Sequence, residues 1–322
     1  MSNCVLMEHC CEVRIPTYKR PIFLKRALQS LLDQTHTNWK GIIYDDSPES
    51  EAEQVVKDFD DERFIYKQNE RKLNGAGNID QCFRSLPIAS GRYACTLEDD
   101  NLLRPDFIKS NIQILEKKGV KVLLRNQEVW NQFSEEAERT GRTTRGNWLD
   151  EGFMESDEIK STLFLFEGLS NGGIFWRTDC DTNFQVGDTI LDSGLQEYCR
   201  TLQLAEPIYF AKEPLAVWSD MNPDLIKRKI STRRVWSRGR QSVTHYLVKK
   251  DKIKYCKLAQ KVAEKSGKEE ALERAFLEIG IFDQKPANLP ILQRLNIAAK
   301  GLAKWYMVSN PLEKYWQTNQ AI

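Results

Sequence analysis

The chain has 322 residues, which suffices for one domain with an extension or for two domains. Its composition, with 41% hydrophobic residues and a formal net charge of +1, is ordinary for a soluble globular protein. No stretch approaches 18 apolar residues, and residues 1–12 lack a basic start followed by a long apolar run, so we expect neither a membrane-spanning helix nor a secretory signal peptide.

The eight cysteines are scattered along the chain, and no two of them form a CxxC pair. Because the sequence holds only three histidines, we do not expect a zinc site. Reduced thiols in a cytoplasmic protein fit this pattern best.

The first 105 residues alternate between strand-like and helix-like periodicity. Strands are predicted near residues 12–16, 41–46, 63–68 and 93–100, and helices near residues 24–32, 51–59 and 76–88. A further helix is predicted to begin at Pro105, because proline is favoured at the first helical position. This order predicts an α/β fold, in which helices cover both faces of a mostly parallel sheet.

The second half is less regular. Residues 128–168 are polar and are expected to form loops over a pocket. Strands are predicted at 172–176 and 207–211, a helix at 192–205, and mostly helices beyond Trp218. We therefore divide the chain into an α/β domain at residues 1–220, with halves at about 11–125 and 126–220, and a basic helical region at residues 221–322.

Charge is distributed unevenly along the chain. Residues 221–322 hold 21 Lys and Arg against 9 Asp and Glu, a net of +12, whereas residues 1–220 have a net of −11. Within residues 225–261 there are 13 basic residues and one acid, Asp251. We expect an anionic partner at this segment, and the alternative is a solvated basic helix.

Polar and acidic residues stand where predicted strands end. Glu98, Asp99 and Asp100 end the fourth strand, Asp46 ends the second, and residues 16–18 end the first. Because ligands bind outside the carboxyl ends of the strands in such sheets, these segments are expected to meet at one pocket. The alternative is turn and capping chemistry, since Asp and Asn favour loops and helix starts.

Adjacent carboxylates do not easily all stay ionised in a dry pocket, and a divalent cation relieves their repulsion. Mg²⁺ or Mn²⁺ suits oxygen ligands, and Mg²⁺ usually combines one or two carboxylates with substrate phosphates. Asp100, with Asp99 or Glu98, therefore suggests a site for a metal ion and a diphosphate. The sequence has no GxxxxGKS/T or GxGxxG motif, although the turn at residues 74–78 would place phosphates at a helix N-terminus.

Four segments carry the most specific motifs: IPTYKRP (15–21), IIYDDS (42–47), NGAGN (74–78) and SGRYACTLEDDNLLRP (90–105). Together they resemble the family 2 glycosyltransferases, which are inverting enzymes of the GT-A fold. The spacing from Leu97 to Pro105 is similar to that of the spore-coat-polysaccharide-type nucleotide-diphospho-sugar transferases. The resemblance covers about residues 11–218 and implies a Rossmann-like sheet, with a nucleotide-binding half followed by an acceptor half.

The resemblance implies roles at the nucleoside. Pro16, Thr17 and Tyr18 are expected to line its pocket, with Tyr18 near the base. Asp46 is expected to accept a hydrogen bond from the base, from uracil if the donor is a UDP-sugar, although dTDP and GDP stay open. Asn78 is expected near the nucleotide or the acidic cluster.

The resemblance also implies roles at the diphosphate. Asp100 is expected to reach a Mn²⁺ or Mg²⁺ ion and the diphosphate, and Asp99 is expected to face the ribose or the sugar. Glu98 stands where the family often has the first Asp of an Asp-x-Asp motif. This departure leaves open which carboxylates bind the metal.

Inversion requires a general base that deprotonates the acceptor hydroxyl on the side opposite the leaving diphosphate. In the family this base is an acid just ahead of a helix in the second half, here within residues 184–199. Asp192 is favoured because its spacing to KEPL (212–215) fits, Asp188 is the second candidate, and Glu197 is the third. A helix N-cap is the alternative role for either aspartate.

Other segments are assigned to acceptors and surfaces. SNGG (170–173) resembles the family's acceptor-side loop, and residues 227–240 are expected to close over the donor diphosphate or to hold a phosphate-bearing acceptor. The amphipathic basic helix at residues 291–307 is expected to contact the inner face of the cell membrane, and the alternatives are packing on the catalytic domain or a homodimer contact. His245 is a candidate metal ligand, with an ordinary packed histidine as the alternative.

The leading hypothesis is a metal-dependent inverting glycosyltransferase that acts in polysaccharide, glycolipid or natural-product assembly. A nucleotidyltransferase on a related sheet would need a Gly-rich N-terminal loop, which residues 16–21 do not provide. A non-catalytic nucleic-acid-binding protein would use residues 225–261, but only three aromatic side chains there could stack on bases. We therefore expect no nucleic-acid partner.

Overall fold

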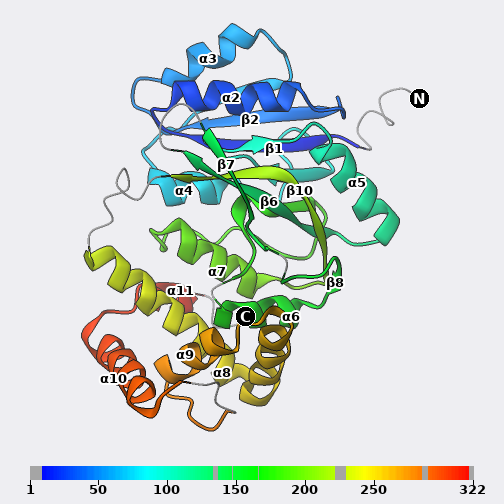
Figure 1. Cartoon of the computed structure of the whole chain (residues 1–322). Helices are drawn as coiled ribbons and strands as arrows, with labels where there is room; N and C mark the ends of the chain where they lie inside the picture. The colour runs from blue at the N-terminus through cyan, green and yellow to red at the C-terminus, as the bar shows by residue number, and fades with distance from the viewer. Residues whose placement is uncertain are drawn as a thin grey trace.

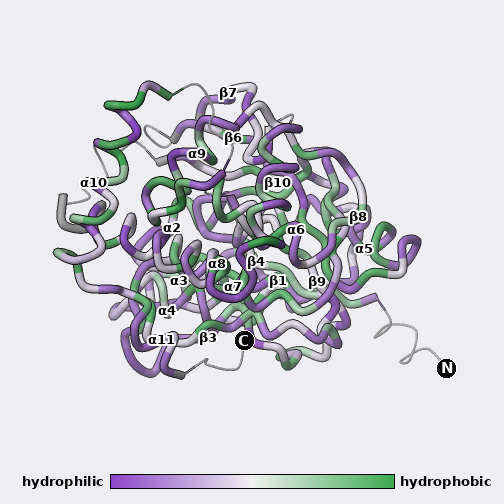
Figure 2. Tube along the Cα trace, turned by 90° about the horizontal axis from the view of Figure 1, so that it is seen from below, coloured by the Kyte–Doolittle hydropathy of each residue, from purple (hydrophilic) through white to green (hydrophobic). Residues whose placement is uncertain are grey.

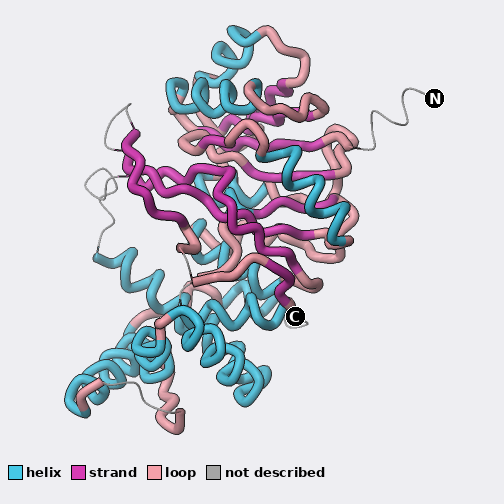
Figure 3. Tube along the Cα trace, turned by 45° about the vertical axis from the view of Figure 1, so that its right-hand side comes forward, coloured by secondary structure: helices cyan, strands magenta, loops and turns pink. Residues whose placement is uncertain are grey.

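The computed structural model describes residues 9–132, 137–146, 148–165, 167–221, 230–284 and 289–318. Within them lies a mixed sheet of ten strands in the order β3-β2-β1-β4-β9-β6-β10-β5, with β7 paired to β6 and β8 paired to β10. Figure 1 shows helices α2 and α3 at one end of the molecule and helices α8 to α11 gathered at the other. Figure 3 shows the same separation between the sheet and this helical layer.

The first half has the predicted β/α alternation. Strands β1 (Cys11–Thr17), β2 (Trp39–Asp45), β3 (Phe64–Gln68) and β4 (Tyr93–Thr96) pair in parallel. The helices between and after them are α2 (Pro21–Leu32), α3 (Glu51–Phe59), α4 (Asn74–Gln81) and α5 (Phe107–Lys118). The α/β fold class is therefore confirmed.

Side chains of β1 alternate between the two faces of the sheet, as a period of two requires. Val13 and Ile15 belong to a core that they share with Leu28 of α2 and Ile108 of α5. The buried Arg14 faces the other way and donates to the carbonyl oxygens of residues 82, 84 and 86 at 3.0, 2.6 and 3.3 Å. Both faces of the sheet are thus covered.

Two helix boundaries differ from the prediction. Helix α4 ends at Gln81 rather than near residue 88, and the carbonyl oxygens of Cys82 and Arg84 beyond its end accept from Arg14 at 3.0 and 2.6 Å. Helix α5 begins at Phe107 rather than at Pro105, since Pro105 and Asp106 form a turn whose carbonyl at Pro105 accepts from the Thr35 amide at 2.8 Å.

The prediction of loops at residues 128–168 is wrong. Strand β6 (Val122–Gln132) pairs antiparallel with β7 (Ala137–Thr143), and β8 (Gly152–Met154), α6 (Ser156–Ser161) and a 3-10 turn (Thr162–Leu165) follow. Polar side chains of this segment have partners: Glu128 accepts from Arg104 at 2.6 Å, and the buried Arg145 donates to Glu167 at 3.0 Å. Because these partners are distant in sequence, polarity alone misled the prediction.

The remaining strands complete the sheet. Strand β9 (Ile174–Arg177) pairs antiparallel with β4 and β6, and β10 (Ile208–Met221) pairs in parallel with β6 and antiparallel with β5 (Leu102–Leu103). Between them lie a 3-10 turn (Asn171–Gly173) and α7 (Ser193–Gln203). The second half therefore adds antiparallel pairings to the parallel sheet of the first half.

The chain beyond β10 is helical, as predicted. Its helices are α8 (Ile230–Ser266), which breaks at Asp251, α9 (Glu269–Glu278), α10 (Ile291–Met307) and α11 (Glu313–Thr318). Leu247 and Phe276 belong to one buried cluster with Leu163 and Leu202 of the preceding region. The helical region thus shares a core with the second half of the α/β domain, and the boundary at residue 220 stays a prediction.

A buried ion pair joins the two halves of the α/β domain. Arg200 of α7 donates to Asp80 of α4 at 2.8 Å and to Asn171 at 2.8 Å. Asp80 also accepts from the backbone amides of Val186 and Gly187 at 2.9 and 2.8 Å. One carboxylate thereby fixes α4, α7 and the segment that leads to α7.

None of the helices in the described ranges combines the length and the apolar character that crossing a bilayer demands.

Candidate active site

The strand ends of the first half meet at a cavity of about 370 Å³, which we call the first cavity. Its walls contain nearly all of the residues predicted for a nucleotide site: Pro16, Thr17, Tyr18, Asp46, Glu98, Asp99 and Asp100. The turn before α4 contributes Asn74 and Gly75. The predicted convergence of the three strand ends is therefore observed.

The acids after β4 are held by neighbours from β1 and α2. The Thr17 hydroxyl donates to Oδ2 of Asp99 at 2.8 Å. The guanidinium of Arg20 donates to Asp99 at 3.3 Å and to Asp100 at 2.8 Å. Arg20 thus supplies one positive charge between two carboxylates of the first cavity, and its own pKa is raised by them although burial opposes the rise.

Burial disfavours the ionised form of all three acids, and repulsion by Asp100 adds to this effect at Glu98 and Asp99. Burial, reinforced by the charge of Asp100, raises the pKa of Glu98 to about 8. Burial and Asp100 also raise the pKa of Asp99 to about 7, against the lowering effects of Arg20 and Thr17. The pKa of Asp100 is raised by burial, and Arg20 opposes that rise. The positive charges near the cluster, Arg20 foremost, therefore do not offset the cost of ionising all three acids.

This donor set fits a divalent cation. Carboxylate oxygens are hard ligands, and the raised pKa values mean that an added positive charge would be stabilising. Among the described residues, no three Asp, Glu, His or Cys side chains are gathered as a ready-made metal cage. Substrate oxygens would therefore have to complete the coordination, as is usual for Mg²⁺ with phosphates. His245 lies elsewhere, where it packs on Trp305 with 4.8 Å between ring centroids.

Asp46 organises a wall of the first cavity. Its carboxylate accepts from the backbone amides of Leu73 and Asn74, both at 2.8 Å, and from the Asn69 side chain at 2.9 Å. Asn78 is buried behind the wall, where its amide nitrogen donates to the carbonyl oxygens of Thr17 and Tyr44 at 3.1 Å. Asp46 therefore lines the cavity, whereas Asn78 joins the ends of β1 and β2 to α4.

Two basic side chains that line the first cavity, Arg20 and Lys72, were not predicted as site residues. Arg20 lies within the quoted segment at residues 15–21, so its position beside a strand end was a usable signal. The Lys72 ammonium lies 4.9 Å from the ring centroid of Tyr18 and 3.4 Å from its hydroxyl. Lys72 follows β3 by only a few residues, and its position near a predicted strand end would have marked it too.

A second cavity of about 420 Å³ adjoins the first, and Glu98 lines both. Its walls come from β6, β7, α7, β10 and α8, through residues that include Gln127, Arg142, Arg145, Glu197, Trp218 and Trp236. Ser170 and Gly172 also line it, so the predicted acceptor-side loop lies at this cavity. The two cavities are therefore neighbours that share one carboxylate.

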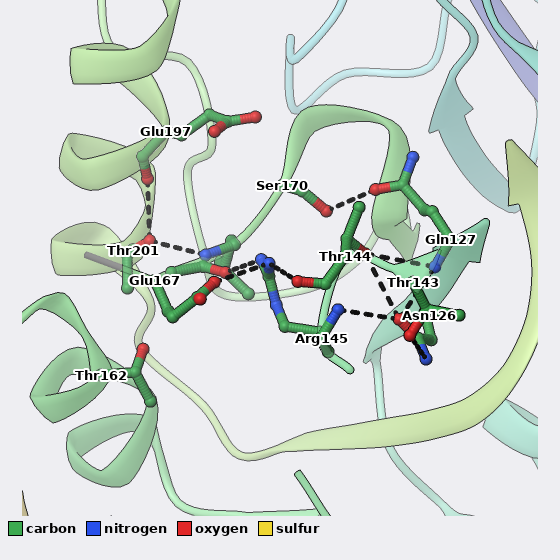
Figure 4. Close-up of polar contacts among 12 residues, drawn as sticks. Asn126, Gln127, Thr143, Thr144, Arg145, Thr162, Glu167, Ser170, Glu197 and Thr201 are labelled. Carbon is green, nitrogen blue, oxygen red and sulfur yellow. Dashed lines mark hydrogen bonds and ion pairs between the residues drawn. The ribbon is translucent and has the colours of Figure 1, made fainter. Parts of the chain in front are cut away.

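A polar network fixes the loop that lines the second cavity (Figure 4). Arg145 donates to Glu167 at 3.0 Å and to the carbonyl oxygen of Gly168. Ser170 donates to Oε1 of Gln127 at 2.9 Å, and the Thr201 hydroxyl accepts from the Leu169 amide at 2.9 Å. Helix α7 and strand β6 thereby hold two consecutive residues of this loop, Leu169 and Ser170.

Glycine is required within the loop because the backbone is crowded. A Cβ atom at Gly173 would lie 2.8 Å from the Arg125 carbonyl oxygen, and one at Gly172 would lie 2.9 Å from the Gln127 amide nitrogen. On the opposite wall, a Cβ at Gly194 would lie 3.1 Å from Nε1 of Trp236. The glycines therefore serve close packing of the cavity walls.

The three candidate bases have different environments. Asp192 is the N-cap of α7 and accepts from the Leu195 amide at 3.0 Å, and Asp188 is 81% exposed, 3.9 Å from Arg71. Neither aspartate is among the residues that line the two cavities. Glu197, one turn into α7, lines the second cavity, and its Oε1 accepts from the Asn171 amide at 2.7 Å.

Burial raises the pKa of Glu197, although the Asn171 amide and the charges of Arg145 and Arg200 oppose the rise. The aspartate assignments stay predictions, and Glu197 is the acid that the geometry favours. Of the walls of the second cavity, Glu197 was ranked third as a base and Trp236 lies in the predicted segment at residues 227–240, whereas Arg145 was not predicted as a site residue. Arg145 lies in a stretch that was expected to be loop, so no motif marked it.

The comparisons with known proteins agree with this geometry. A family model described as glycosyl transferase family 2 matches residues 12–171. A β-1,3-glucosyltransferase of Escherichia coli, named as acting on UDP-Glc and α-D-GlcNAc-diphosphoundecaprenol, is 24% identical over 39% of this chain and 49% of its own length. Protein CgeD of Bacillus subtilis is 28% identical over 60% of this chain and 47% of its own length.

A further relative is also named as a glycosyltransferase. The amylovoran biosynthesis glycosyltransferase AmsB of Erwinia amylovora is 29% identical over 33% of this chain and 35% of its own length. The chain thus spans about half of the length of the first two relatives and about a third of this one. The crystal structure of TarS 1-349 from S. aureus in complex with UDP has the same fold, with a TM-score of 0.50 and 14% identity over 96% of this chain and 75% of that one.

Proposed function

The chain belongs to glycosyl transferase family 2, and on this premise we propose that it transfers a sugar from a nucleotide-diphosphate donor to an acceptor hydroxyl, with inversion. The observation that carries the proposal is the pair of adjoining cavities that share Glu98. An inverting transfer needs the donor on one side of the reacting carbon and the acceptor on the other. Two cavities in contact provide that arrangement.

The donor is proposed to occupy the first cavity. Tyr18 offers an aromatic face, with Lys72 beside it, and Thr17 positions Asp99 by a hydrogen bond of 2.8 Å. Asp46 is proposed to meet the base, and a UDP-sugar is the preferred donor because the pyrimidine N3–H suits a carboxylate acceptor. Asp46 would do so while it still holds the 69–74 turn through the bonds described above.

A Mn²⁺ or Mg²⁺ ion is proposed to bind between Asp100, with Glu98 or Asp99, and the donor diphosphate. Such an ion stabilises the negative charge that develops on a leaving diphosphate. Arg20 already contacts Asp99 and Asp100, so this residue is proposed to share its hydrogen bonds between the acids and the phosphates. The carboxylates would bind the cation, and Arg20 would hold Asp99 and Asp100 in position.

The acceptor is proposed to occupy the second cavity. Trp218 and Trp236 offer flat apolar faces to a sugar ring, and the loop at residues 168–172 forms the opposite wall. Glu197 is proposed to remove the proton of the attacking hydroxyl, because its Asn171 hydrogen bond fixes one oxygen and because burial raises its pKa, which makes the carboxylate a stronger base. Asp192 is proposed to cap α7 instead.

The acceptor belongs, in this proposal, to polysaccharide or glycolipid assembly. The E. coli relative is named as acting on a diphosphoundecaprenol-linked sugar, and AmsB is named for amylovoran biosynthesis. A nucleotidyltransferase, the alternative from the sequence, is not retained because of the family membership.

Thermal unfolding with UDP, dTDP, GDP, CDP and ADP, each with and without Mn²⁺, tests the donor assignment. A ligand at a hundredfold excess over its dissociation constant stabilises the native state by about 2.7 kcal/mol. We expect UDP to raise the Tm strongly only when Mn²⁺ is present. Absence of a response to every nucleotide would reject the transferase proposal, and a response to GDP alone would reject a UDP-sugar as the donor.

A further inference from the structure

Helix α10 turns its large apolar side chains outward. Its exposed large apolar residues, between 51% and 83% exposed, are Ile291, Leu292, Leu295, Leu302, Tyr306 and Met307, which we call the outer stripe. Only Ala298 and Gly301 of the helix are buried. An amphipathic helix on a globular core normally has the opposite orientation, with its apolar side inward. Figure 1 and Figure 2 show α10 at the edge of the molecule.

Polar contacts hold the inner side of α10. Arg294 pairs with the buried Glu273 of α9 at 2.8 Å. Lys304 donates to the Ser237 hydroxyl of α8 at 2.5 Å and lies 3.8 Å from Glu278. Charged side chains of α10 thus contact α8 and α9, whereas the residues of the outer stripe stay exposed.

A close backbone contact prevents α10 from turning over. A Cβ atom at Gly301 would lie 2.5 Å from the carbonyl oxygen of Glu278, so α10 and the end of α9 touch through backbone. The Gln241 side chain donates to the carbonyl oxygens of both Glu278 and Gly301, at 3.0 and 3.2 Å. The outward direction of the stripe is therefore built into the packing.

The exposed charge of α10 is positive. The helix contains no acid, and Lys300 is its exposed basic residue, because Arg294 and Lys304 are paired with Glu273 and Glu278 on the inner side. The first turns of α8 lie beside it, since the buried Arg238 guanidinium stacks 3.7 Å from the ring centroid of Trp305. A second copy of the chain would bring the same positive charge to this face. An anionic lipid surface complements both this charge and the apolar side chains.

The same contacts connect α10 to the second cavity. Three consecutive residues of α8 link them: Trp236 lines the cavity, Ser237 binds Lys304, and Arg238 stacks on Trp305. A surface to which the outer stripe binds would therefore be separated from this wall of the second cavity by α10 itself.

We propose that α10 is an interfacial helix, which lies flat on an anionic bilayer with the outer stripe among the lipid acyl chains and Lys300 at the headgroups. The inference rests on α10 and its neighbours and does not depend on the proposed transferase reaction. If both hold, an acceptor anchored in the same bilayer would reach the second cavity without leaving the membrane.

Co-sedimentation of the full chain with vesicles tests the proposal. We expect strong binding to vesicles that contain phosphatidylglycerol and weak binding to pure phosphatidylcholine vesicles. Leu295→Ser with Leu302→Ser should reduce binding at least about tenfold, because two large apolar contacts are lost. Lys300→Glu should weaken binding to the anionic vesicles by about fivefold or more. Ile253→Ser, at an isoleucine of α8 that is even more exposed (83%) than Leu295 and Leu302, is the control and should bind as the wild type does.

Two results would overturn the proposal. One is failure of the intact chain to bind anionic vesicles at low salt. The other is concentration-dependent self-association, measured by light scattering, that the two serine substitutions abolish, since the stripe would then be a contact between copies. Unchanged circular dichroism and Tm of each variant establish that lost binding is not lost folding. No nucleotide or acceptor enters the assay, so its outcome is separate from that of the donor experiment.

Discussion

The first and second cavities are built in different ways. The first is assembled from strand ends that follow one another within residues 16–100, each separated by a single helix. The second draws on β6, β7, α7, β10 and α8, which are spread from residue 127 to residue 236. The first cavity is thus a direct product of parallel β/α topology, whereas the second depends on long-range packing and can change when any of several distant elements changes.

The largest effect is expected at the acids of the first cavity. Asp100→Ala removes the carboxylate that binds Arg20 at 2.8 Å and that is proposed to hold the metal ion. We expect donor cleavage to fall by at least about 1,000-fold, because charge stabilisation at the leaving diphosphate is lost. The measurement is UDP release with Mn²⁺, and Asp58→Ala on the exposed side of α3 is the control. Full turnover of Asp100→Ala would remove this residue from the metal site.

The second cavity is tested next, at its acid. Glu197→Gln keeps the Asn171 hydrogen bond possible but cannot take a proton, so kcat should fall by about 10² to 10⁴ while nucleotide affinity and acceptor KM stay close to the wild type. Asp192→Asn keeps a good N-cap and should retain transfer. Asp188→Asn, at an exposed side chain, should also retain it. The reverse pattern would return the role of base to whichever aspartate loses activity.

A smaller effect is expected at the aromatic wall of the second cavity. Trp236→Ala removes a flat face beside Gly194 and should raise the acceptor KM by about tenfold with little change in kcat, since such a contact binds ground and transition states alike. Val235→Ala, at the exposed neighbouring position, is the control. An unchanged KM would exclude Trp236 from acceptor binding. A loss of nucleotide affinity would show that the two cavities are not separate in function.

The smallest effect concerns stability against pH. The folded-state pKa values of Glu98 and Asp99, about 8 and about 7, lie above the ordinary 4.5 and 3.8, so the folded chain binds more protons between these limits. The free energy of unfolding should therefore fall as pH rises from about 4 to about 8 in metal-free buffer. The measurement is the Tm at several pH values between about 4 and about 8. In Glu98→Gln the Tm should fall less as pH rises, and in Glu197→Gln it should fall as in the wild type if the first cavity causes the effect.

Sequence patterns predicted which residues line the first cavity because these residues lie in short segments whose strands and turns the local sequence indicates. Asp46 and residues 98–100 each end a strand whose position the period-two pattern gives, and parallel topology then brings these ends together. Asn78 was predicted close to the correct place, but it proves to be a buried connector with four hydrogen bonds rather than a wall. A sequence gives the position of such a residue more readily than the direction of its side chain.

The second cavity resisted prediction for the opposite reason. Within residues 128–168, β6 and β7 pair antiparallel, and polar side chains such as Glu128 and Arg145 have partners elsewhere in the chain, Arg104 and Glu167. Periodicity treats buried polar residues as exposed, so the segment was expected to be loop. Glu197 was ranked behind Asp192 because motif spacing favours the residue at the helix start, whereas the cavity lies one turn further along α7.

The buried pair of Asp80 and Arg200 bears on how this chain can be re-engineered. Asp80 comes from the first half and Arg200 from the second. Loss of either would leave the other as an unpaired buried charge, which lowers the free energy of unfolding by about 3 to 5 kcal/mol. A hybrid that grafts another protein's second half onto residues 11–125 would therefore have to inherit an arginine at the position of Arg200. Where that arginine is absent, changing Asp80 as well, to an uncharged residue of similar size, would be the compensating substitution that makes the exchange viable.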